Sequence, residues 1–409
     1  MKCKLIIFLK PLINRPFIRF LVFFAGYILY PVSFLVPRRK KKWAFGSFRN
    51  AFNDNAKYLF IYAAENNPNA EVVWISADKN TVQRIRDLGL KSYFIGSFRG
   101  VYHALTSRYW FFNAYTTDIL FFASGGAVCT NLWHGLPLKR IEFNIKGGSL
   151  SARYVKKTFG ERFFHPEAYR RPDYVLSTTD FVSARFAEAF RVGTSQCLNI
   201  AYPRNTILLA GKQERISFIK KYEQEETLRI ISDSHGYENV YIYMPTWRES
   251  QADIFSQNMD INRLNELMRR KNSLLLLKPH ANTKVDINLA ECPNVLLLNN
   301  KVDIYTILPY TDVLITDYSS VLYDYILMDD KDVILYLYDY DEYANNRDFN
   351  FPFLENVAGR DVYDFAGLID VMESGDYKMD ENKREEIISK FWGVRKSDSV
   401  CKTILEAVM

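Results

Sequence analysis

The stretch VLITDYSSVLYDY, from Val313 to Tyr325, decides the fold of the second half of the chain. Four apolar or β-branched residues end at Asp317, and after two serines the apolar residues take the spacing of an amphipathic helix. A short buried strand that turns directly into a helix is typical of a parallel sheet covered by helices. The stretch therefore predicts an α/β fold.

The same alternation of short apolar runs and amphipathic stretches extends in both directions from this unit. A chain of 409 residues exceeds what one hydrophobic core usually serves, so we expect two doubly wound domains, at 43–205 and 206–382. The final helical pattern, 383–409, has no strand after it and is expected to pack back across both domains. Predicted strands lie at 43–47, 71–76, 91–95, 108–113, 174–177, 197–200, 240–244, 273–277, 295–298, 313–316 and 333–337. Predicted helices lie at 56–65, 79–88, 180–190, 212–222, 260–270, 304–308 and 319–328.

Residues 1–42 have the features of a membrane anchor. The apolar segment 17–36 has about the ~20 residues that cross a bilayer as a helix, but Pro31 and Pro37 favour a segment lying in the interface. The basic run 38–42 suggests an anionic lipid surface on the cytoplasmic side. The alternatives are a single membrane span and a buried core helix.

Charge and cysteine content exclude several classes of protein. The net charge of +6 is modest, and no zinc finger, RNP-type sequence or long basic arm supports nucleic-acid binding. The five cysteines are scattered without CxxC spacing, which predicts neither a disulfide framework nor a zinc site. No metal cluster is evident, and no bound cofactor is expected.

The segment WHGLPLKR, Trp133 to Arg140, places a histidine on a turn after an apolar run. His134 stands before Gly and Pro, where helix or strand packing does not require it. Its imidazole suits accepting a proton from an attacking hydroxyl near neutral pH. A histidine that caps a strand end is the structural alternative.

Two further segments end predicted strands with cationic side chains. In MPTWR the guanidinium of Arg248 offers a fork of donors that suits a phosphate. In LKPH, Lys278 and His280 follow a run of four leucines and resemble an anion site. Solvated loop residues are the alternative for both segments.

The serine pair in the opening stretch adds a helix N-terminus to this inventory. Ser319 or Ser320 can cap the helix and leave backbone N–H groups for a pyrophosphate. An ordinary N-cap accounts for one serine, but not for the pair with Asp317 before it and Asp324 one turn inside. With no nucleophile elbow, GxGxxG, Walker loop or HExxH, the set indicates attack at phosphorus or an anomeric carbon of a nucleoside diphosphate donor.

These four segments, together with DNAKYL at 54–59 and YPRN at 202–205, resemble the CDP-glycerol glycerophosphotransferase family, which builds teichoic-acid linkages and chains. The resemblance covers about 43–343. It implies a GT-B-like fold of two Rossmann-type domains, with the acceptor in the first and the CDP-alcohol donor mainly in the second. It also implies transfer of glycerol phosphate or ribitol phosphate to a hydroxyl of a lipid-linked glycan, with release of CMP. The implied location is the cytoplasmic face of the cell membrane, with peripheral or monotopic attachment.

The resemblance also implies roles for single residues. His134 would activate the acceptor hydroxyl, and His280 would contact or polarise the donor pyrophosphate. Donor binding and charge stabilisation would fall to Arg248, Lys278, Asp317, Ser319, Ser320 and Asp324. Further phosphate or acceptor contacts would come from Lys139, Arg204 and Thr246.

Departures from the family pattern concentrate in or near the first domain. Leu136 stands where the family usually has Thr, Glu142 where it often has Gly, and Phe48 to Asn50 where a Gly-rich turn is common. Two other functions therefore stay open from the sequence. One is a GT-B glycosyltransferase that uses a nucleotide sugar for capsule or cell-surface polysaccharide synthesis, and the other is an inactive membrane scaffold.

Overall fold

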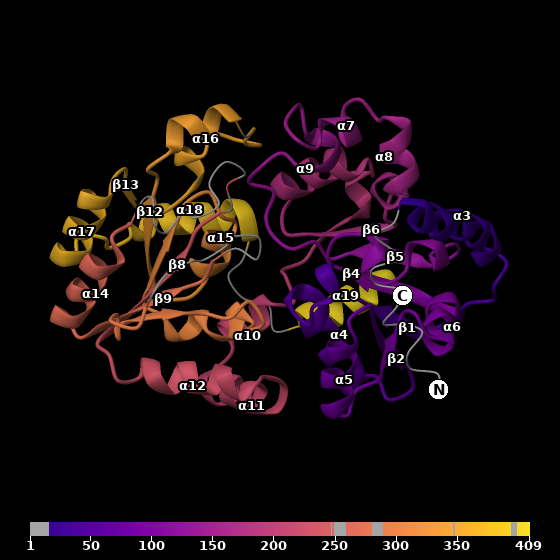
Figure 1. The fold of residues 1–409 in the computed structure, drawn as a ribbon, viewed down its shortest axis with the longest axis horizontal. Helices are drawn as coiled ribbons and strands as arrows, with labels where there is room; N and C mark the ends of the chain where they lie inside the picture. Colours follow the sequence, from indigo (N-terminus) through magenta and orange to yellow (C-terminus); the bar gives the residue numbers. More distant parts are fainter. Residues whose placement is uncertain (1–15, 247, 249–258, 280–288, 347, 394–398) are drawn as a thin grey trace.

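The computed structural model describes residues 16–246, 248, 259–279, 289–346, 348–393 and 399–409. The chain forms two α/β domains that lie side by side, each a parallel sheet with helices on both faces (Figure 1). The first sheet has the strand order β3-β2-β1-β4-β5-β6-β7, and the second has β10-β9-β8-β11-β12-β13. Both follow the 3-2-1-4-5-6 order of doubly wound folds, so each sheet has a switch point beside its first strand.

The first domain is built from the following elements. Its strands are β1 (Arg39–Phe45), β2 (Glu71–Ser76), β3 (Ser92–Phe94), β4 (Ser107–Phe112), β5 (Val128–Asn131), β6 (Tyr174–Ser177) and β7 (Cys197–Asn199). Its helices are α3 (Pro16–Ser33), α4 (Asp54–Asn66), α5 (Lys79–Asp87), α6 (Phe98–Thr106), α7 (Ser151–Tyr154), α8 (Phe159–Phe164) and α9 (Asp180–Phe190). Short 3-10 turns include η3 (Phe121–Ala123), η4 (Glu142–Asn144) and η5 (Pro166–Tyr169).

The second domain follows the linker helix α10 (Asn205–Leu209). Its strands are β8 (Asn239–Met244), β9 (Ser273–Leu277), β10 (Val295–Leu297), β11 (Val313–Thr316), β12 (Asp332–Tyr336) and β13 (Arg360–Val362). Its helices are α11 (Lys212–Tyr222), α12 (Glu225–Ser234), α14 (Ile261–Arg270), α15 (Val321–Tyr325), α16 (Tyr340–Asn346) and α17 (Phe365–Ser374), and η7 (Ile304–Thr306) lies between β10 and β11.

Local sequence explains where these elements begin. The strands β9 and β11 are buried along their whole length, as expected for parallel strands covered on both faces. Side chains of Asp78, Thr179 and Asp364 accept hydrogen bonds from backbone N–H groups and cap the helices that follow. Apolar strands followed by polar helix caps therefore account for the alternation of strands and helices along the chain.

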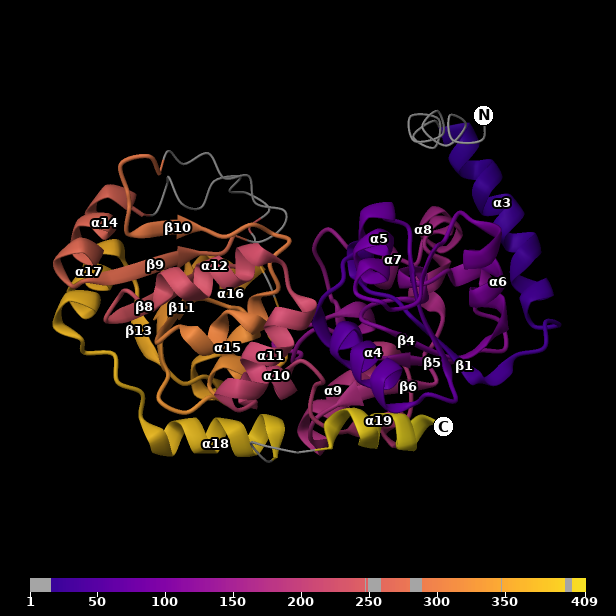
Figure 2. The ribbon, with the colours of Figure 1, turned by 90° about the horizontal axis from the view of Figure 1, so that it is seen from below.

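The C-terminal segment returns to the first domain. Helix α18 (Glu381–Trp392) lies under the second domain and α19 (Val400–Val408) under the first (Figure 2). The indole N–H of Trp392 donates to the Tyr323 carbonyl at 2.9 Å, and the Tyr109 hydroxyl donates to the Met409 carbonyl at 3.2 Å. The chain end thus spans both domains.

The N-terminal segment differs in part from the prediction. Strand β1 begins at Arg39, so the basic run belongs to the first sheet and does not precede it. Arg38 donates to the carbonyls of Ser107 and Ala123, and Lys42 is buried in an ion pair with Glu71. Arg38 and Lys42 thus bind other groups of the first domain. The exposed cations of the run are Arg39, Lys40 and Lys41.

Helix α3 packs one face on the first domain. Tyr27 donates to the Phe163 carbonyl at 2.9 Å, and the Tyr30 ring stacks on Phe121 with centroids 4.9 Å apart. Phe20, Phe24, Ile28 and Val32 are exposed on the opposite face. Within the part of the chain that the structure describes, every helix falls short of the length and apolar character that crossing a bilayer requires.

Candidate active site between the two domains

The segments singled out in the sequence follow the strands on either side of the switch points. Residues 46–53 follow β1 and residues 113–118 follow β4 in the first domain, and the His134 turn follows β5. In the second domain, Thr246 and Arg248 follow β8, and Asp317 to Ser320 follow β11. Ligands of doubly wound sheets bind at these carboxyl ends.

The His134 ring is held with one nitrogen paired. Its Nδ1 lies 3.2 Å from the carbonyl oxygen of Asn113. Because a carbonyl only accepts, Nδ1 carries the hydrogen and Nε2 is left as the acceptor. The ring lies between Trp133, 4.2 Å away, and Phe48, 6.2 Å away and nearly parallel.

The environment of His134 favours a neutral imidazole. His134 is exposed to solvent, yet the protein atoms around its ring still desolvate it. This desolvation lowers the pKa of His134 below its usual value near 6.5. The ring is therefore able to accept a proton at neutral pH.

Arg204 binds the backbone of the His134 turn and links it to both domains. Its Nη1 donates to the His134 carbonyl at 2.9 Å and to Asp54 at 2.8 Å, while Nε and Nη2 bind both oxygens of Asp324. The Asn55 side chain donates to the Trp133 carbonyl at 3.0 Å. Arg204 and Asp324 are both buried, so neither side chain reaches solvent.

Gly135 and Ser320 bring the two domains together. A Cβ atom on Gly135 would collide with the Ser320 hydroxyl, so only glycine permits this approach. The Ser320 side chain makes no cap hydrogen bond to the five-residue helix α15. Ser319 accepts from the Val321 N–H at 3.5 Å, and both serines are half-buried. The His134 turn and the serine pair therefore lie next to each other.

Arg248 lies at the centre of a second buried group. It binds Asp339 through Nε at 2.7 Å and Asp317 through Nη1 at 2.9 Å, and its guanidinium lies 4.7 Å from the centre of the Tyr343 ring. The Thr246 N–H donates to Asp317. Arg248 and Asp317 thus form an ion pair with each other. The buried Thr246 Oγ1, by contrast, has no hydrogen-bond partner among the described residues.

A backbone strap ties Lys139 to the second domain. The Asn350 N–H donates to the Leu138 carbonyl at 3.0 Å, and the Arg140 N–H donates to the Asp348 carbonyl at 2.8 Å. The Lys139 ammonium lies 5.0 Å from the centre of the Tyr343 ring. This strap, 138–140 paired with 348–350, holds the His134 turn against the second domain.

The remaining predicted residues are Lys278 and His280. Lys278 donates to Asn300 at 2.7 Å, and burial lowers the pKa of Lys278 to about 8. His280 lies outside the described residues. Over the described ranges, no group of three or more His, Cys, Asp or Glu side chains has the arrangement of a metal site.

The structure also identifies residues that sequence reasoning did not assign. Asn55 and Asn113 contact the His134 turn, Asp54 binds Arg204, and Asp339 completes the Arg248 group. Asp54 and Asn55 were visible as part of the DNAKYL match. The sequence did not point to Asn113, because its backbone carbonyl, not its side chain, contacts the His134 ring.

Comparison with known proteins agrees with this geometry. The family of CDP-Glycerol:Poly(glycerophosphate) glycerophosphotransferases matches residues 28–406. A teichoic acid glycerol-phosphate transferase of Staphylococcus aureus is 26% identical over 375 residues, which cover 87% of this chain and 90% of the relative. A teichoic acid poly(glycerol phosphate) polymerase of Staphylococcus epidermidis is 26% identical over 351 residues, and there the chain spans only 45% of the relative's length.

Among solved structures, the wall teichoic acid polymerase TagF aligns with a TM-score of 0.75 at 22% identity, over 96% of this chain and 95% of that one. This likeness confirms the predicted GT-B-like fold of two parallel-sheet domains. The family match covers most of the chain and includes the four segments from which the resemblance was first drawn. The chain therefore belongs to the CDP-glycerol:poly(glycerophosphate) glycerophosphotransferase family and is a transferase.

Proposed function

We propose that the chain transfers glycerol phosphate from CDP-glycerol to a hydroxyl of a lipid-linked glycan. The acceptor oxygen attacks the phosphorus that carries glycerol, the bond from that phosphorus to the CMP oxygen breaks, and CMP leaves with the electron pair. His134 Nε2 takes the proton of the acceptor hydroxyl. The observation that carries this role is the pairing of Nδ1 with the Asn113 carbonyl, which leaves Nε2 as a base.

The donor diphosphate is proposed to lie along the carboxyl ends of β8 and β11. Three features support this position: the unpaired Thr246 hydroxyl, the half-buried Ser319 and Ser320, and the Lys278 ammonium. The buried pairs of Arg248 with Asp317 and of Arg204 with Asp324 are proposed to position these groups, not to bind phosphate themselves. His280 stays a prediction as the group that polarises the diphosphate.

Attachment to the membrane is proposed to be peripheral, through the exposed face of α3. Phe20, Phe24, Ile28 and Val32 recur every four residues on that face, and Arg39 to Lys41 are exposed just beyond the helix. An apolar stripe beside exposed cations matches an anionic lipid surface. The acceptor would then be reached at the cytoplasmic face.

The direct test measures the release of CMP from CDP-glycerol or CDP-ribitol, and of UDP from a UDP-sugar, in the presence of acceptor-containing membranes. We expect CMP release with a CDP-alcohol, reduced by roughly 10²- to 10⁴-fold in His134→Ala. His165→Ala is the matched control, because His165 lies half-buried in the α7–α8 region and pairs with Glu167. Full turnover in His134→Ala, or turnover only of the UDP-sugar, would reject the proposal.

A further inference from the structure

The side chain of Phe48 lies against the His134 ring at the carboxyl end of β1. The two rings are nearly parallel, with 10° between their planes and 6.2 Å between their centroids. The Trp133 ring is the other aromatic neighbour of the imidazole, with centroids 4.2 Å apart. Aromatic rings at such separations attract one another. The proposed base therefore lies between two aromatic side chains, of which Trp133 is buried and Phe48 is 46% exposed.

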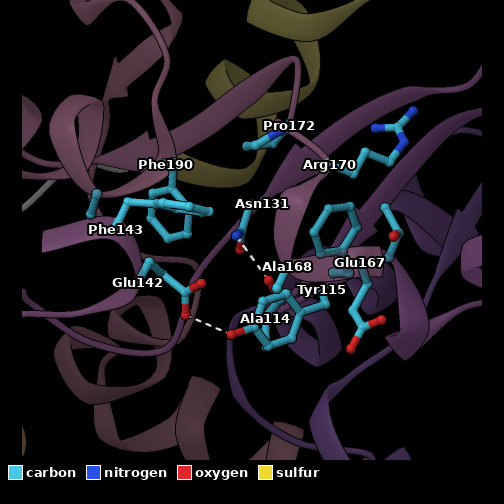
Figure 3. Close-up of a pocket in the computed structure, with 13 residues that line it drawn as sticks. Ala114, Tyr115, Asn131, Glu142, Phe143, Glu167, Ala168, Arg170, Pro172 and Phe190 are labelled. Atoms are coloured by element: carbon cyan, nitrogen blue, oxygen red, sulfur yellow. Dashed lines mark hydrogen bonds between the residues drawn. The ribbon is translucent and has the colours of Figure 1, made fainter. Parts of the chain in front are cut away.

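Buried groups fix the edge of the imidazole. Nδ1 is paired with the Asn113 carbonyl, and the N–H groups of Asn113 and Ala114 both donate to Asp118. The Asn131 amide donates to the Ala114 carbonyl at 3.0 Å (Figure 3), and its oxygen accepts from the Trp133 N–H at 2.9 Å. The side chains of Asn113, Asp118 and Asn131 are buried. The edge of the ring and the indole beside it thus share one buried hydrogen-bonded frame.

The turn that carries Phe48 is joined to this frame. It is a single 3-10 turn, η1 (Phe48–Asn50), and Ser47 comes directly before it. The Asn113 amide donates to the Ser47 hydroxyl at 2.8 Å, and both side chains are buried. Asn113 therefore contacts the His134 ring through its carbonyl and the start of η1 through its amide. The same residue fixes the imidazole and the segment that places Phe48 beside it.

The backbone of η1 is strained. Arg49 and Asn50 have φ of 57° and 61°, in the left-handed region that residues other than glycine rarely adopt. Asn50 Oδ1 accepts from the Ala77 N–H at 2.6 Å, which fixes the end of the turn. The exposed Arg49 places its guanidinium 5.2 Å from the centre of the Phe48 ring. Strain of this kind recurs at functional sites, where the surrounding structure imposes one conformation.

The charged groups that act on the imidazole belong to other segments. Desolvation lowers the pKa of His134, Asp54 and the Asn113 carbonyl raise it, and Arg204 lowers it. Asp54 and Arg204 form an ion pair with each other at 2.8 Å. Replacement of an uncharged ring beside the imidazole leaves both charges in place. An effect of that ring on the base must therefore arise from contact and from the exclusion of water.

We infer that Phe48 is a positioning residue for the proposed base: its ring lies parallel to the imidazole, limits the tilt of the imidazole away from the Asn113 carbonyl, and keeps Nε2 directed at the acceptor hydroxyl. The inference rests on the proposed function and adds to it a residue that acts through His134. The strained η1 turn holds the Phe48 ring in place, and Phe48 itself contacts no reacting atom.

The first test follows the His134 imidazole by ¹⁵N NMR of the full chain without substrate, with His134→Gln identifying its signals. The unaltered protein should show a neutral ring with its hydrogen on Nδ1. In Phe48→Ala water reaches the ring, so we expect the titration of His134 to move to higher pH, toward about 6.5. Phe48→Tyr retains the ring and should titrate as the unaltered protein does.

Phe98→Ala is the matched control for this titration, because Phe98 is an 87% exposed phenylalanine of helix α6 in the same domain. It should leave the titration of His134 unchanged. An unchanged titration in Phe48→Ala, or the same shift in Phe98→Ala, overturns the inference.

The second test measures CMP release at saturating CDP-glycerol with acceptor-containing membranes. We expect Phe48→Ala to lower kcat by about tenfold, with the KM for CDP-glycerol changed by less than about twofold, because the base is misdirected while the donor site is intact. Phe48→Tyr should restore kcat. If Phe48 acts through His134, the double variant Phe48→Ala, His134→Ala should be no slower than His134→Ala.

A further loss of kcat in the double variant, or a change in the KM for CDP-glycerol alone, would show that Phe48 contacts substrate and would overturn the inference. Phe48→Leu retains the apolar bulk without a planar ring, so it should lose kcat at an unchanged melting temperature even where Phe48→Ala is destabilised. Full activity of Phe48→Leu also overturns the inference. Absence of CMP release in the unaltered protein rejects the proposed function, whereas the NMR titration still tests the contact of Phe48 with His134.

Discussion

Arg204 and Asp324 form a buried two-point ion pair that joins the domains directly beneath His134, with nitrogen to oxygen distances of 3.2 and 2.8 Å. Arg204 also donates to Asp54 and to the His134 carbonyl. One side chain therefore links the first domain, the second domain and the turn that carries the proposed base.

Removal of Arg204 is expected to destabilise the protein strongly, because Asp324 is left buried without its partner. Arg204→Ala should lower the free energy of unfolding by about 3–5 kcal/mol. Arg270→Ala is the matched control, since Arg270 pairs with Glu373 at an exposed site and should cost less than about 1 kcal/mol. Urea denaturation followed by circular dichroism measures both, and equal costs would contradict the proposed role of the pair.

Gly135→Ala is expected to push the His134 turn away from the serine pair. The new methyl group would collide with the Ser320 hydroxyl, so CMP release should fall by at least tenfold with a lower melting temperature. Gly147→Ala meets nothing within 4 Å and serves as control. Adding Ser320→Gly should restore the melting temperature of Gly135→Ala. If it does not, the collision is not the cause.

The pH dependence of turnover should follow the His134 imidazole. Desolvation by the surrounding protein atoms lowers the pKa of His134, so the neutral, active form is present at pH 7 and is lost only as the pH falls below about 6.5. We therefore expect kcat/KM for CMP release to be flat between about pH 7 and 8 and to decline in more acidic buffer. An acid limb centred above pH 7 would argue against a neutral base at this position.

The same shift makes the stability of the protein depend on pH. A histidine whose pKa is lowered by folding binds fewer protons in the folded state than in the unfolded state. The contribution of His134 to stability is then fully present above its unfolded pKa and is lost as the pH falls below about 6.5 and through the lower pKa of the folded state. His134→Gln should flatten this part of the curve of melting temperature against pH, and an unchanged slope would show that other groups cause it.

Membrane binding is expected to depend on the exposed face of α3. Phe24 and Ile28 are 54% and 59% exposed, and placing Glu at both should abolish co-flotation with vesicles that contain anionic lipid. Tyr363→Glu is the control, because Tyr363 is equally exposed but lies in the second domain. Retained flotation of the double variant would show that another surface binds lipid.

Much of the fold was predictable because strands and helices here follow their local signals. The expected strands 71–76, 174–177, 273–277 and 313–316 match β2, β6, β9 and β11. Strands β5 and β13 and helices α6, α7, α8, α12 and α17 were among the elements missed, because their patterns are short or interrupted by polar residues. The helix expected at 319–328 ends at Tyr325, where the chain continues as turns.

The sequence predicted which residues form the candidate site better than it predicted which of them bind one another. The sequence identified the His134 turn and the serine pair as separate segments, and the structure shows that Gly135 and Ser320 bring them together. It did not show that Arg248, Asp317, Arg204 and Asp324 neutralise one another inside the protein. Spacing along a chain identifies groups of opposite charge, but only packing decides whether they meet each other or a substrate.

The return of the C-terminal segment to the first domain affects how the protein is synthesised. Val400, Cys401, Ile404, Leu405 and Val408 of α19 join the hydrophobic core that also contains residues of α4. The first of the two domains along the chain is thus completed by residues that are synthesised after the second domain. A chain shortened by about ten residues would expose apolar surface on the domain most distant from the truncation in sequence.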